Sequence, residues 1–424
     1  MKTIVFVRIF NDFDHALPII DYLTRYKGQV VTIYGIGEEY KKCNKHISYL
    51  EDILSNKVIP FEEKFYSNNH KILLKFLEKI RVLFKSENKI IDLSFNILLP
   101  QIRRIIYYLA SGSVDNFISR LSNNSVIMAD FGTEGQFPYK YIIRKSQKKR
   151  ILAIAYLHGY YIWTNLNVLR VNKSKLPTKI TTLINKFVFG KGVNDFYDKY
   201  LVAPNAIDTH FKSNLYLGFN KYERVMGIGI PRFSYEWIER FSTNKSYESK
   251  TLKKINNNKI NVALFLSSDT YEVNRILLNK TVIWLLDSNK VNLTIKPHPR
   301  AGLSGIDKND ISIVSKVSEL NSSDIIEWAD VGILYGSSIA LEMIIRNVVV
   351  VVPKYIDNNK TIIEEKNACI AVESLQELSN FFDKYSDDAI LPSKSNIDTF
   401  IKEIIYGNNS SYEEMMDKYT YFLE

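Results

Sequence analysis

Hydrophobic and polar positions alternate in blocks along the first 240 residues of the chain. Short β-branched and aliphatic runs are separated by longer segments whose apolar residues recur with helical spacing. We predict buried strands at Thr3–Val7, Val30–Tyr34, Val126–Ala129, Ile151–Tyr156 and Lys199–Val202. Strands that alternate with helices are typical of βαβ units around a parallel sheet. Residues 1–240 are therefore expected to form a Rossmann-like domain.

The same pattern starts again after a polar stretch. Residues 241–258 are rich in Asn, Lys and Ser and have few apolar positions, so we predict a domain linker there. Further strands are predicted at Ile260–Leu266, Val291–Ile295, Ile311–Val314, Val331–Leu334 and Val348–Val352. The expected fold class is α/β, with a second Rossmann-like domain over residues 259–395 that faces the first across a cleft, and helices over residues 396–424.

One long segment interrupts the pattern of the first domain. Residues 68–123 are predicted to form a helical insertion, in which Ile72–Lys85 combines a broad apolar face with several basic residues. That combination is typical of a helix lying at a membrane surface. It is equally typical of a core helix whose long basic side chains extend to solvent. The sequence leaves both interpretations open.

Composition and charge restrict the kinds of partner that the protein is expected to bind. The chain has 424 residues and 46% hydrophobic content, which suits two domains better than one. Its 56 Lys and Arg residues exceed the 46 Asp and Glu residues, for a formal net charge of +10. The excess favours an anionic partner, such as a nucleotide, a phospholipid surface or an acidic glycan. Because the basic residues are dispersed, with no aromatic-interleaved stripe, a nucleic acid is not the expected partner.

Cysteine usage and the apolar segments indicate a cytoplasmic protein. The two cysteines, Cys43 and Cys369, are too few for a disulfide framework and are not spaced as zinc ligands. The N-terminus turns polar at Asn11 before a signal peptide could form, and no run of about 18 apolar residues is present. We therefore expect a cytoplasmic protein, in which any contact with the inner face of the cytoplasmic membrane is peripheral.

The most specific motif is Lys296-Pro297-His298-Pro299-Arg300, which directly follows a predicted strand. Each proline fixes its own φ angle and removes an N–H donor, so the two prolines hold the backbone of His298 rigidly. Open α/β sheets bind ligands at the carboxyl ends of their strands. Lys296, His298 and Arg300 therefore offer donors to a phosphate. The alternative is a histidine that only bonds a carbonyl group within the turn.

A second turn, Gly336-Ser337-Ser338, lies between the strand Val331–Leu334 and a predicted helix. Gly336 permits a tight entry, either serine can cap the helix, and Glu342 lies about one turn inside it. Free N–H groups and the helix dipole bind anions at such a start. We predict that these residues hold the phosphate together with the histidine turn. A helix cap that binds nothing is the alternative.

Candidates for a general base lie at two strand ends of the first domain. His158 follows the strand Ile151–Tyr156, and Asp130 and Glu134 follow the strand Val126–Ala129. A histidine with an ordinary pKa of about 6.5 is suited to proton transfer near neutral pH, whereas a carboxylate is a weaker base unless it is desolvated. We favour His158 and keep Glu134 and Asp130 as alternatives.

Residues suited to an acceptor lie in loops that are expected at the cleft. Asn11, Asp14 and His15 follow the first strand and can bind a hydroxyl group, and Tyr161 and Trp163 can stack on a sugar ring. A helix start capped near Asp14, and simple aromatic packing, are the alternatives.

The two C-terminal motifs together resemble those of bacterial polysaccharide transferases. Lys-Pro-His-Pro followed by Ser-Ser-x-x-x-Glu and a Val-rich strand ending at Pro353 is similar to polysialyltransferases, capsule Kdo transferases and CDP-glycerol glycerophosphotransferases. Leu157-His158-Gly159 and Gly229-Ile230-Pro231-Arg232 extend the resemblance, which covers most of residues 150–355. It implies the GT-B fold, with the C-terminal helices packing back across the first domain.

The resemblance also implies an activity. In the family pattern a histidine of the second half stabilises the leaving phosphate, which is the role of His298 here, and a residue of the first half is the general base. No Asp-x-Asp motif stands at a strand end, so we expect a metal-independent mechanism without any cofactor. The leading expectation is an inverting glycosyltransferase that moves a CMP-linked ulosonic acid, such as Kdo or a sialic-like acid, onto a capsule or lipopolysaccharide glycan, free or lipid-linked.

Three other activities remain open at this point. A CDP-glycerol or CDP-ribitol polyol-phosphate transferase is favoured by His158-Gly159. A UDP-sugar 2-epimerase would have the same two-domain architecture. A non-catalytic nucleotide-binding module would bind the donor without turnover.

Overall fold

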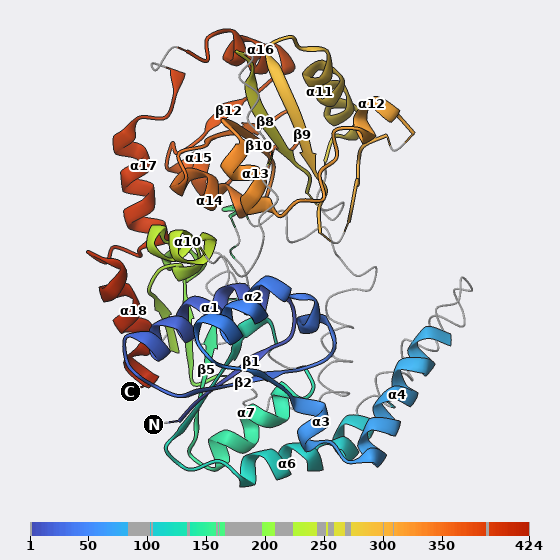
Figure 1. Ribbon diagram of the computed structural model, residues 1–424, viewed down its shortest axis with the longest axis vertical. Coiled ribbons are helices and arrows are strands. Elements are labelled where there is room, and N and C mark those ends of the chain that lie inside the picture. Colours follow the sequence, from blue (N-terminus) through green and yellow to red (C-terminus); the bar gives the residue numbers. More distant parts are fainter. Residues whose placement is uncertain are drawn as a thin grey trace, which may run out of the picture.

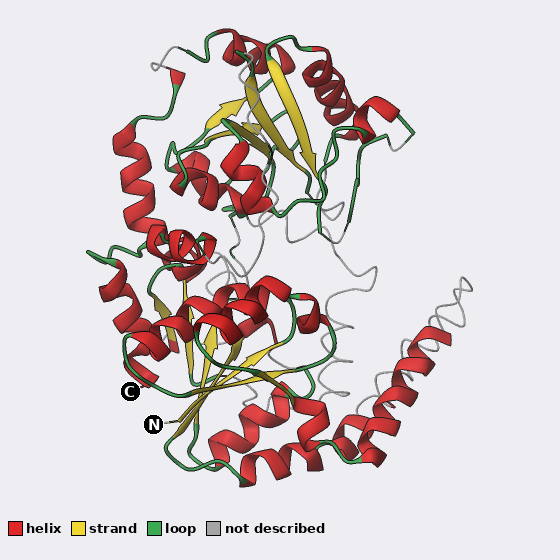
Figure 2. Ribbon diagram, in the orientation of Figure 1, coloured by secondary structure: helices red, strands yellow, loops and turns green. Residues whose placement is uncertain are grey.

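Two α/β units lie one above the other in this protein, each with a central sheet flanked by helices (Figure 1; Figure 2). The lower unit holds the N-terminal half and the upper unit the C-terminal half, and the last helices run down one side. The computed structural model describes residues 2–83, 102, 105–133, 136–157, 160, 162–165, 197–207, 224–243, 252, 258–267, 273–299, 301–307, 309–386 and 390–423.

The N-terminal sheet is parallel throughout, with the strand order β3-β2-β1-β4-β5-β6-β7. Alternate side chains of β1 enter different cores: Ile4 and Phe6 join one cluster, and Val5 and Val7 join the other. Because both faces of the sheet are covered, its strands are hydrophobic nearly throughout. The strands are β1 (Lys2–Val7), β2 (Val31–Gly35), β3 (Val58–Pro60), β4 (Ser125–Asp130), β5 (Leu152–Tyr156), β6 (Lys199–Val202) and β7 (Val225–Gly227).

Helices cover both faces of this sheet, and one extends from it. The α4 helix projects from the body of the domain (Figure 1). Residues 105–110 are also helical, and α6 packs beside α7. The helices are α1 (Phe10–Arg25), η1 (Glu39–Lys42), α2 (Asn44–Ser48), η2 (Tyr49–Ile53), α3 (Phe61–Phe65), α4 (Asn68–Leu83), α6 (Gly112–Ser119), η3 (Phe131–Thr133), α7 (Tyr139–Lys148), α9 (Pro204–Ala206), η7 (Pro231–Phe233) and α10 (Tyr235–Ser242).

The C-terminal sheet is also parallel, with the strand order β12-β11-β10-β8-β9. Most of the predicted linker at residues 241–258 lies outside the described residues. The strands are β8 (Ile260–Phe265), β9 (Val291–Lys296), β10 (Val331–Leu334), β11 (Val349–Pro353) and β12 (Ile370–Val372). The helices are α11 (Arg275–Asp287), α12 (Ile311–Val314), α13 (Ser322–Trp328), α14 (Ile339–Ile345), α15 (Ile362–Glu365) and α16 (Leu375–Asp383).

The strand predicted at Ile311–Val314 is wrong, because these residues form the short helix α12. Asp310 caps the helix: its carboxylate accepts hydrogen bonds from the backbone N–H groups of Ser312 at 2.8 Å and Ile313 at 3.4 Å. Ile311 is 84% exposed, so the segment is not a buried strand. The capping aspartate therefore outweighs the strand preference of the β-branched residues.

The C-terminal segment returns to the first domain, which confirms the predicted packing. It consists of α17 (Lys394–Phe400), η9 (Ile401–Ile405), α18 (Tyr412–Thr420) and η10 (Tyr421–Leu423). The segment crosses the loop after β7 so closely that a Cβ atom on Gly407 would lie 1.9 Å from the carbonyl oxygen of Ile228. Asn409 donates to the same oxygen at 2.7 Å, and the Tyr419 hydroxyl donates to the Gly229 carbonyl at 2.9 Å.

Candidate active site

Each sheet reverses its strand order at one point. In the N-terminal sheet β1 lies between β2 and β4, and in the C-terminal sheet β8 lies between β9 and β10. Open α/β sheets bind ligands beyond the carboxyl ends of the strands at such a switch point. The loops after β1 and β4, and those after β8, β9 and β10, therefore define the candidate site.

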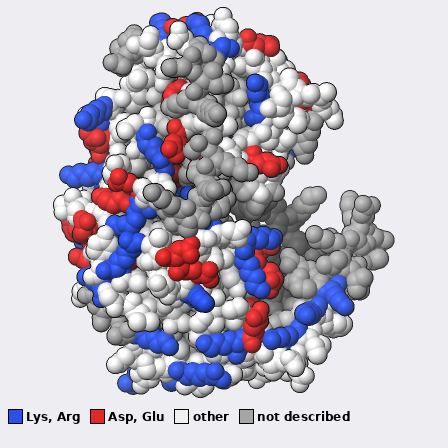
Figure 3. Space-filling model, in the orientation of Figure 1, with Lys and Arg blue, Asp and Glu red and all other residues white. Residues whose placement is uncertain are grey.

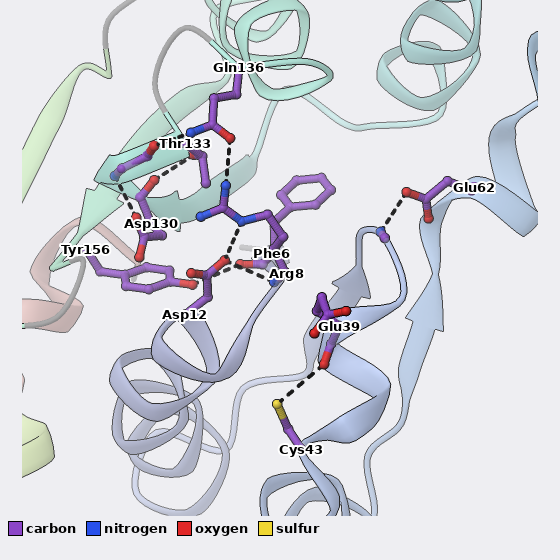
Figure 4. A network of polar contacts seen from close by, with 12 residues as sticks. Phe6, Arg8, Asp12, Glu39, Cys43, Glu62, Asp130, Thr133, Gln136 and Tyr156 are labelled. Atoms are coloured by element: carbon purple, nitrogen blue, oxygen red, sulfur yellow. Dashed lines mark hydrogen bonds and ion pairs between the residues drawn. The ribbon is translucent and has the colours of Figure 1, made fainter. Parts of the chain in front are cut away.

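A polar network joins the loops after β1 and β4 (Figure 4). Arg8 Nη1 donates to Gln136 Oε1 at 2.6 Å, and the Arg8 backbone N–H donates to Asp12 Oδ2 at 3.0 Å. Across the switch point, Asp130 Oδ1 accepts from the N–H of Gly132 at 2.6 Å. Asp12 and Asp130 are both fully buried. The network fixes the two loops relative to each other.

The structure gives Asp130 a different role from the predicted general base. Its carboxylate holds the Gly132 amide and has no exposed surface. A general base must come within hydrogen-bonding distance of the proton that it removes, and in this structure the Asp130 carboxylate offers no exposed surface to an acceptor hydroxyl group. The other predicted bases, His158 and Glu134, lie outside the described residues, as do Tyr161 and Arg300.

The histidine turn after β9 is closed by its own backbone. The His298 N–H donates to the Gly302 carbonyl at 3.0 Å, and the Gly302 N–H donates to the His298 carbonyl at 2.8 Å. The Nδ1 atom of His298 accepts from the Ala301 N–H at 3.1 Å. In the neutral imidazole the proton is then on Nε2, which is the donor that a phosphate group requires.

Lys296 anchors the same turn to the loop that precedes α13 (Ser322–Trp328). Its Nζ donates to the Leu320 carbonyl at 2.6 Å. Burial lowers the pKa of Lys296, against the opposing attraction of Glu319 and Asp324. The ammonium group carries two further N–H donors. Lys296 therefore holds the turn in place, and it still has donors that can meet an anion.

The serine turn after β10 is shaped by a side chain of the first domain. Gly336 has a φ of +65°, and a Cβ atom there would lie 2.1 Å from the indole of Trp163. Trp163 is 5% exposed, so it packs between the domains and is not the acceptor-stacking platform predicted for it. Ser337 and Ser338 remain partly exposed, and Ser337 Oγ makes a long 3.5 Å contact with the Ile339 N–H.

The segment that carries Trp163 crosses from β5 to the C-terminal domain and pairs with it. Trp163 forms an antiparallel bridge with Thr361. The Thr164 N–H donates to the Lys360 carbonyl at 2.9 Å, and the Ile362 N–H donates to the Ile162 carbonyl at 2.8 Å. The loop that follows His158 is thus tied directly to the second domain.

A buried ion-pair cluster forms a second connection between the domains. Arg232, in η7, contacts Asp14 of α1 at 2.5 Å and Glu342 of α14 at 3.0 Å. The three side chains are 9%, 12% and 1% exposed. Asp14 and Glu342 were predicted to bind acceptor and donor, but they are committed to this cluster, and Glu342 has no surface for a ligand.

Electrostatics within the cluster keep Asp14 and Arg232 charged. Burial alone would raise the pKa of Asp14, but attraction to Arg232 and the hydrogen bond with His46 outweigh it and hold this pKa well below its ordinary value. Burial alone would lower the pKa of Arg232, but Asp14 and Glu342 raise it overall. Asp14 and Arg232 are therefore both charged throughout the physiological pH range.

The two remaining predicted acceptor residues lie at the start of α1, near the loop after β1. α1 begins at Phe10 with no side-chain cap, so Asn11 and His15 are inside the helix. Asn11 is partly exposed, whereas His15 is 7% exposed and its ring lies edge-on to Phe233. Only Asn11 of this group presents surface to a ligand.

Sequence reasoning missed Arg8 and Gln136 of the N-terminal network, and it noticed Arg232 only as part of a motif, without its role between the domains. Arg8 directly follows the first strand, and this position was the available signal. Arg232 stands in a Gly-x-Pro-Arg motif, but its partners lie 218 and 110 positions away. Within the described ranges, no three His, Cys, Asp or Glu side chains are grouped as metal ligands. Among the described helices, none has the length and apolar character to cross a bilayer.

Comparison with known proteins identifies the fold. No protein-family model and no curated protein matches the chain. Among solved structures, the glycotransferase of kitacinnamycin has 10% identity and a TM-score of 0.54, over 100% of this chain and 99% of that one. UDP-GlcNAc 2-epimerase from Neisseria meningitidis, bound to UDP-GlcNAc, has 9% identity and a TM-score of 0.53 over the same shares. Arabidopsis thaliana UGT89C1 complexed with UDP-L-rhamnose has 11% identity and a TM-score of 0.50, again over 100% and 99%. At these identities the likeness concerns the fold, and the predicted GT-B class with two Rossmann-like domains is confirmed.

Proposed function

We propose that this protein is a glycosyltransferase that takes its sugar from a nucleotide-activated donor held by the second domain. The observation that carries the proposal is the contact between Trp163 and Gly336, because it brings the loop after β5 against the serine turn after β10. The first of these loops contains the favoured base, His158, and the second contains the proposed donor-binding residues. A base and a leaving group on opposite domains are what a direct displacement across a cleft requires.

The separation of the two donor-binding turns favours a nucleotide over a single phosphate ion. β9 and β10 lie on either side of β8. With a strand spacing of about 4.8 Å, their ends are roughly 10 Å apart. Side chains of His298 and Lys296 on one turn and Ser337 and Ser338 on the other can reach different parts of one nucleoside phosphate across that distance. Charge on the departing phosphate is then neutralised by preorganised donors, without a metal ion.

The donor that we favour is a CMP-linked ulosonic acid, transferred with inversion to a capsule or lipopolysaccharide glycan at the cytoplasmic side of the membrane. This choice rests on the resemblance of the Lys296–Arg300 turn to Kdo transferases and polysialyltransferases. A CDP-polyol donor is the close alternative, on the resemblance of His158-Gly159. The UDP ligands named for two of the similar structures make UDP-sugars the third donor class to test.

Nucleotide binding tests the donor site first. A ligand present at about 100 times its dissociation constant stabilises the folded state by about 2.7 kcal/mol. We expect CMP to raise the melting temperature more than CDP or UDP does, and His298→Ala to reduce the shift. His70→Ala is the matched control, because His70 bonds Ser113 in the insertion. No shift with any of the nucleotides would remove the basis for the donor site.

Turnover tests the reaction. With CMP-ulosonic acid and a glycan acceptor, we expect His298→Ala to lower kcat by about 10²- to 10³-fold, since one preorganised donor to the leaving group is lost. His70→Ala should transfer at the wild-type rate. If His298→Ala also transfers at that rate, the phosphate role is refuted.

A UDP-sugar 2-epimerase is the second candidate, because the similar structures include a UDP-GlcNAc 2-epimerase bound to UDP-GlcNAc, with a TM-score of 0.53 over 100% of this chain. An epimerase converts UDP-GlcNAc when no acceptor is present, whereas a transferase needs the acceptor. Epimerisation of UDP-GlcNAc by the protein alone would decide for this candidate and against the transferase.

A further inference from the structure

The insertion of the first domain exposes apolar side chains that its own core does not use. On α4, Ile72 is 64% exposed and Phe76 is 54% exposed, whereas Leu77 is 6% exposed. Ile72 and Phe76 are four residues apart and lie on one helix face, and Lys79 continues that face one heptad after Ile72. The helix therefore has a buried apolar side and a second apolar stripe in solvent.

The helical residues 105–110 show the same arrangement. Ile105, Tyr108 and Leu109 have the spacing of a single stripe and are 60%, 70% and 51% exposed. Ile106 and Ala110, on the opposite side, are 5% and 0% exposed. A surface helix of a protein with no partner there would carry polar residues at the outer positions. These two helical segments thus present apolar residues outward.

Basic side chains flank these stripes. A surface pocket of about 480 Å³ lies between residues 105–111 and α7, and its lining includes Tyr108, Arg144, Lys145 and Lys148. α7 carries four basic residues and no acidic one. In the space-filling view, Lys and Arg side chains gather along the lower edge of the molecule, where Figure 1 places α3, α6 and α7 (Figure 3).

We propose that this surface, consisting of the exposed faces of α4 and residues 105–110 with the basic rim of α7, docks the protein onto an anionic phospholipid membrane. Ile72, Phe76, Ile105 and Leu109 enter the headgroup region, as the apolar face of an interfacial helix does. Arg144 and Lys148 meet lipid phosphates at the rim. Tyr108 lies at the membrane–water interface, with its apolar ring toward the lipid and its hydroxyl group hydrated.

Charge complementarity decides for a membrane over a protein partner. The rim is basic and the cytoplasmic leaflet of a bilayer is anionic, so the surface and the bilayer are complementary in charge. The proposal does not depend on the transferase reaction, and its test uses neither donor nor acceptor.

Vesicle flotation of the full chain tests the proposal. We expect binding to vesicles of phosphatidylcholine mixed with phosphatidylglycerol, weaker binding to phosphatidylcholine alone, and a decrease as salt is added. Ile105→Ser/Leu109→Ser should lose most of the binding. Arg144→Glu/Lys148→Glu should lose at least about fivefold for each charge removed. At the same ionic strength, inorganic phosphate should release no more protein than chloride does, because the apolar contacts remain.

Matched variants outside the proposed membrane surface provide the control. Ile276→Ser/Ile283→Ser changes two exposed side chains of α11, which are 71% and 48% exposed, and Lys394→Glu/Lys402→Glu reverses two exposed lysines. Both should float like the wild-type protein. Equal binding to neutral and anionic vesicles, no binding to either, greater release by phosphate than by chloride, or equal losses in the control variants would each overturn the proposal. Circular dichroism of every variant shows whether it is folded.

Discussion

Replacement of Arg232 by methionine is expected to destabilise the protein by about 3 to 5 kcal/mol and to loosen the contact between its domains. Arg232 lies between Asp14 of the first domain and Glu342 of the second, and all three side chains are nearly buried. Methionine has a similar length and no charge. The variant therefore leaves two enclosed carboxylates without the cation between them, while the volume of the side chain is largely kept.

The expected magnitude follows from the contact distances of 2.5 and 3.0 Å. At an effective dielectric constant of about 20, unit charges at such distances attract each other by roughly 5 to 7 kcal/mol per contact. Removing three charges from water costs several kcal/mol for each of them. The intact cluster thus contributes little net free energy, whereas loss of one partner exposes the full cost of burying the others.

Chemical denaturation and small-angle X-ray scattering measure the two consequences. Arg240→Met is the matched control, because Arg240 contacts the buried Asp21 at 2.7 Å without reaching the second domain. We expect both variants to unfold at lower denaturant concentration, but only Arg232→Met to increase the radius of gyration. Glu342→Gln combined with Arg232→Met should be less damaging than the sum of the single changes. An Arg232→Met protein with wild-type stability and dimensions would refute the reasoning.

Three further changes have predictable outcomes. Gly336→Ala should lower the melting temperature more than Gly37→Ala, since both have a positive φ but only the first places a methyl group against the indole that packs on it. In denaturant unfolding, Gly28→Ala should lower the free energy of unfolding by about 1 to 3 kcal/mol through its positive φ angle alone. Gly407→Ala should lower it further, because the Cβ atom at position 407 would also meet a carbonyl oxygen. Because the pKa of Asp14 is lower in the folded than in the unfolded protein, the charged carboxylate stabilises the fold fully above the unfolded pKa of about 4, and this stabilisation is lost as the pH falls below that value. Asp14→Asn should therefore flatten the acid limb of a pH–stability curve. An unchanged limb would contradict the assignment.

The regular part of the fold could be predicted because buried parallel strands carry a strong local signal. β-branched runs such as Val348–Val352 are hydrophobic on both faces, so the sequence marks them without knowledge of the neighbours. The strands β3, β7 and β12 were missed, since three residues are too few for a periodic pattern. Ile311–Val314 was misassigned because strand preference was read without the capping aspartate before it.

The site divides in the same way between local and distant contacts. The rigid turn at His298 is specified by two adjacent prolines, and its position at a strand end follows from the strand itself. The roles of Glu342 and Trp163 depend on partners in the other domain, at Arg232 and Gly336. No pattern within a few residues distinguishes a glutamate that binds a ligand from one that is paired with an arginine 110 positions away.

Two of the contacts between the domains involve α14 and the turn before it. The turn before α14 is packed by Trp163 at Gly336, and the body of α14 is held by Arg232 at Glu342. Both contacts come from segments of the first domain that follow strand ends, after β5 and after β7. A relative rotation of the domains would break both contacts together and shift the serine turn. The geometry of the proposed donor site is therefore set by the interface as much as by the domain that contains it.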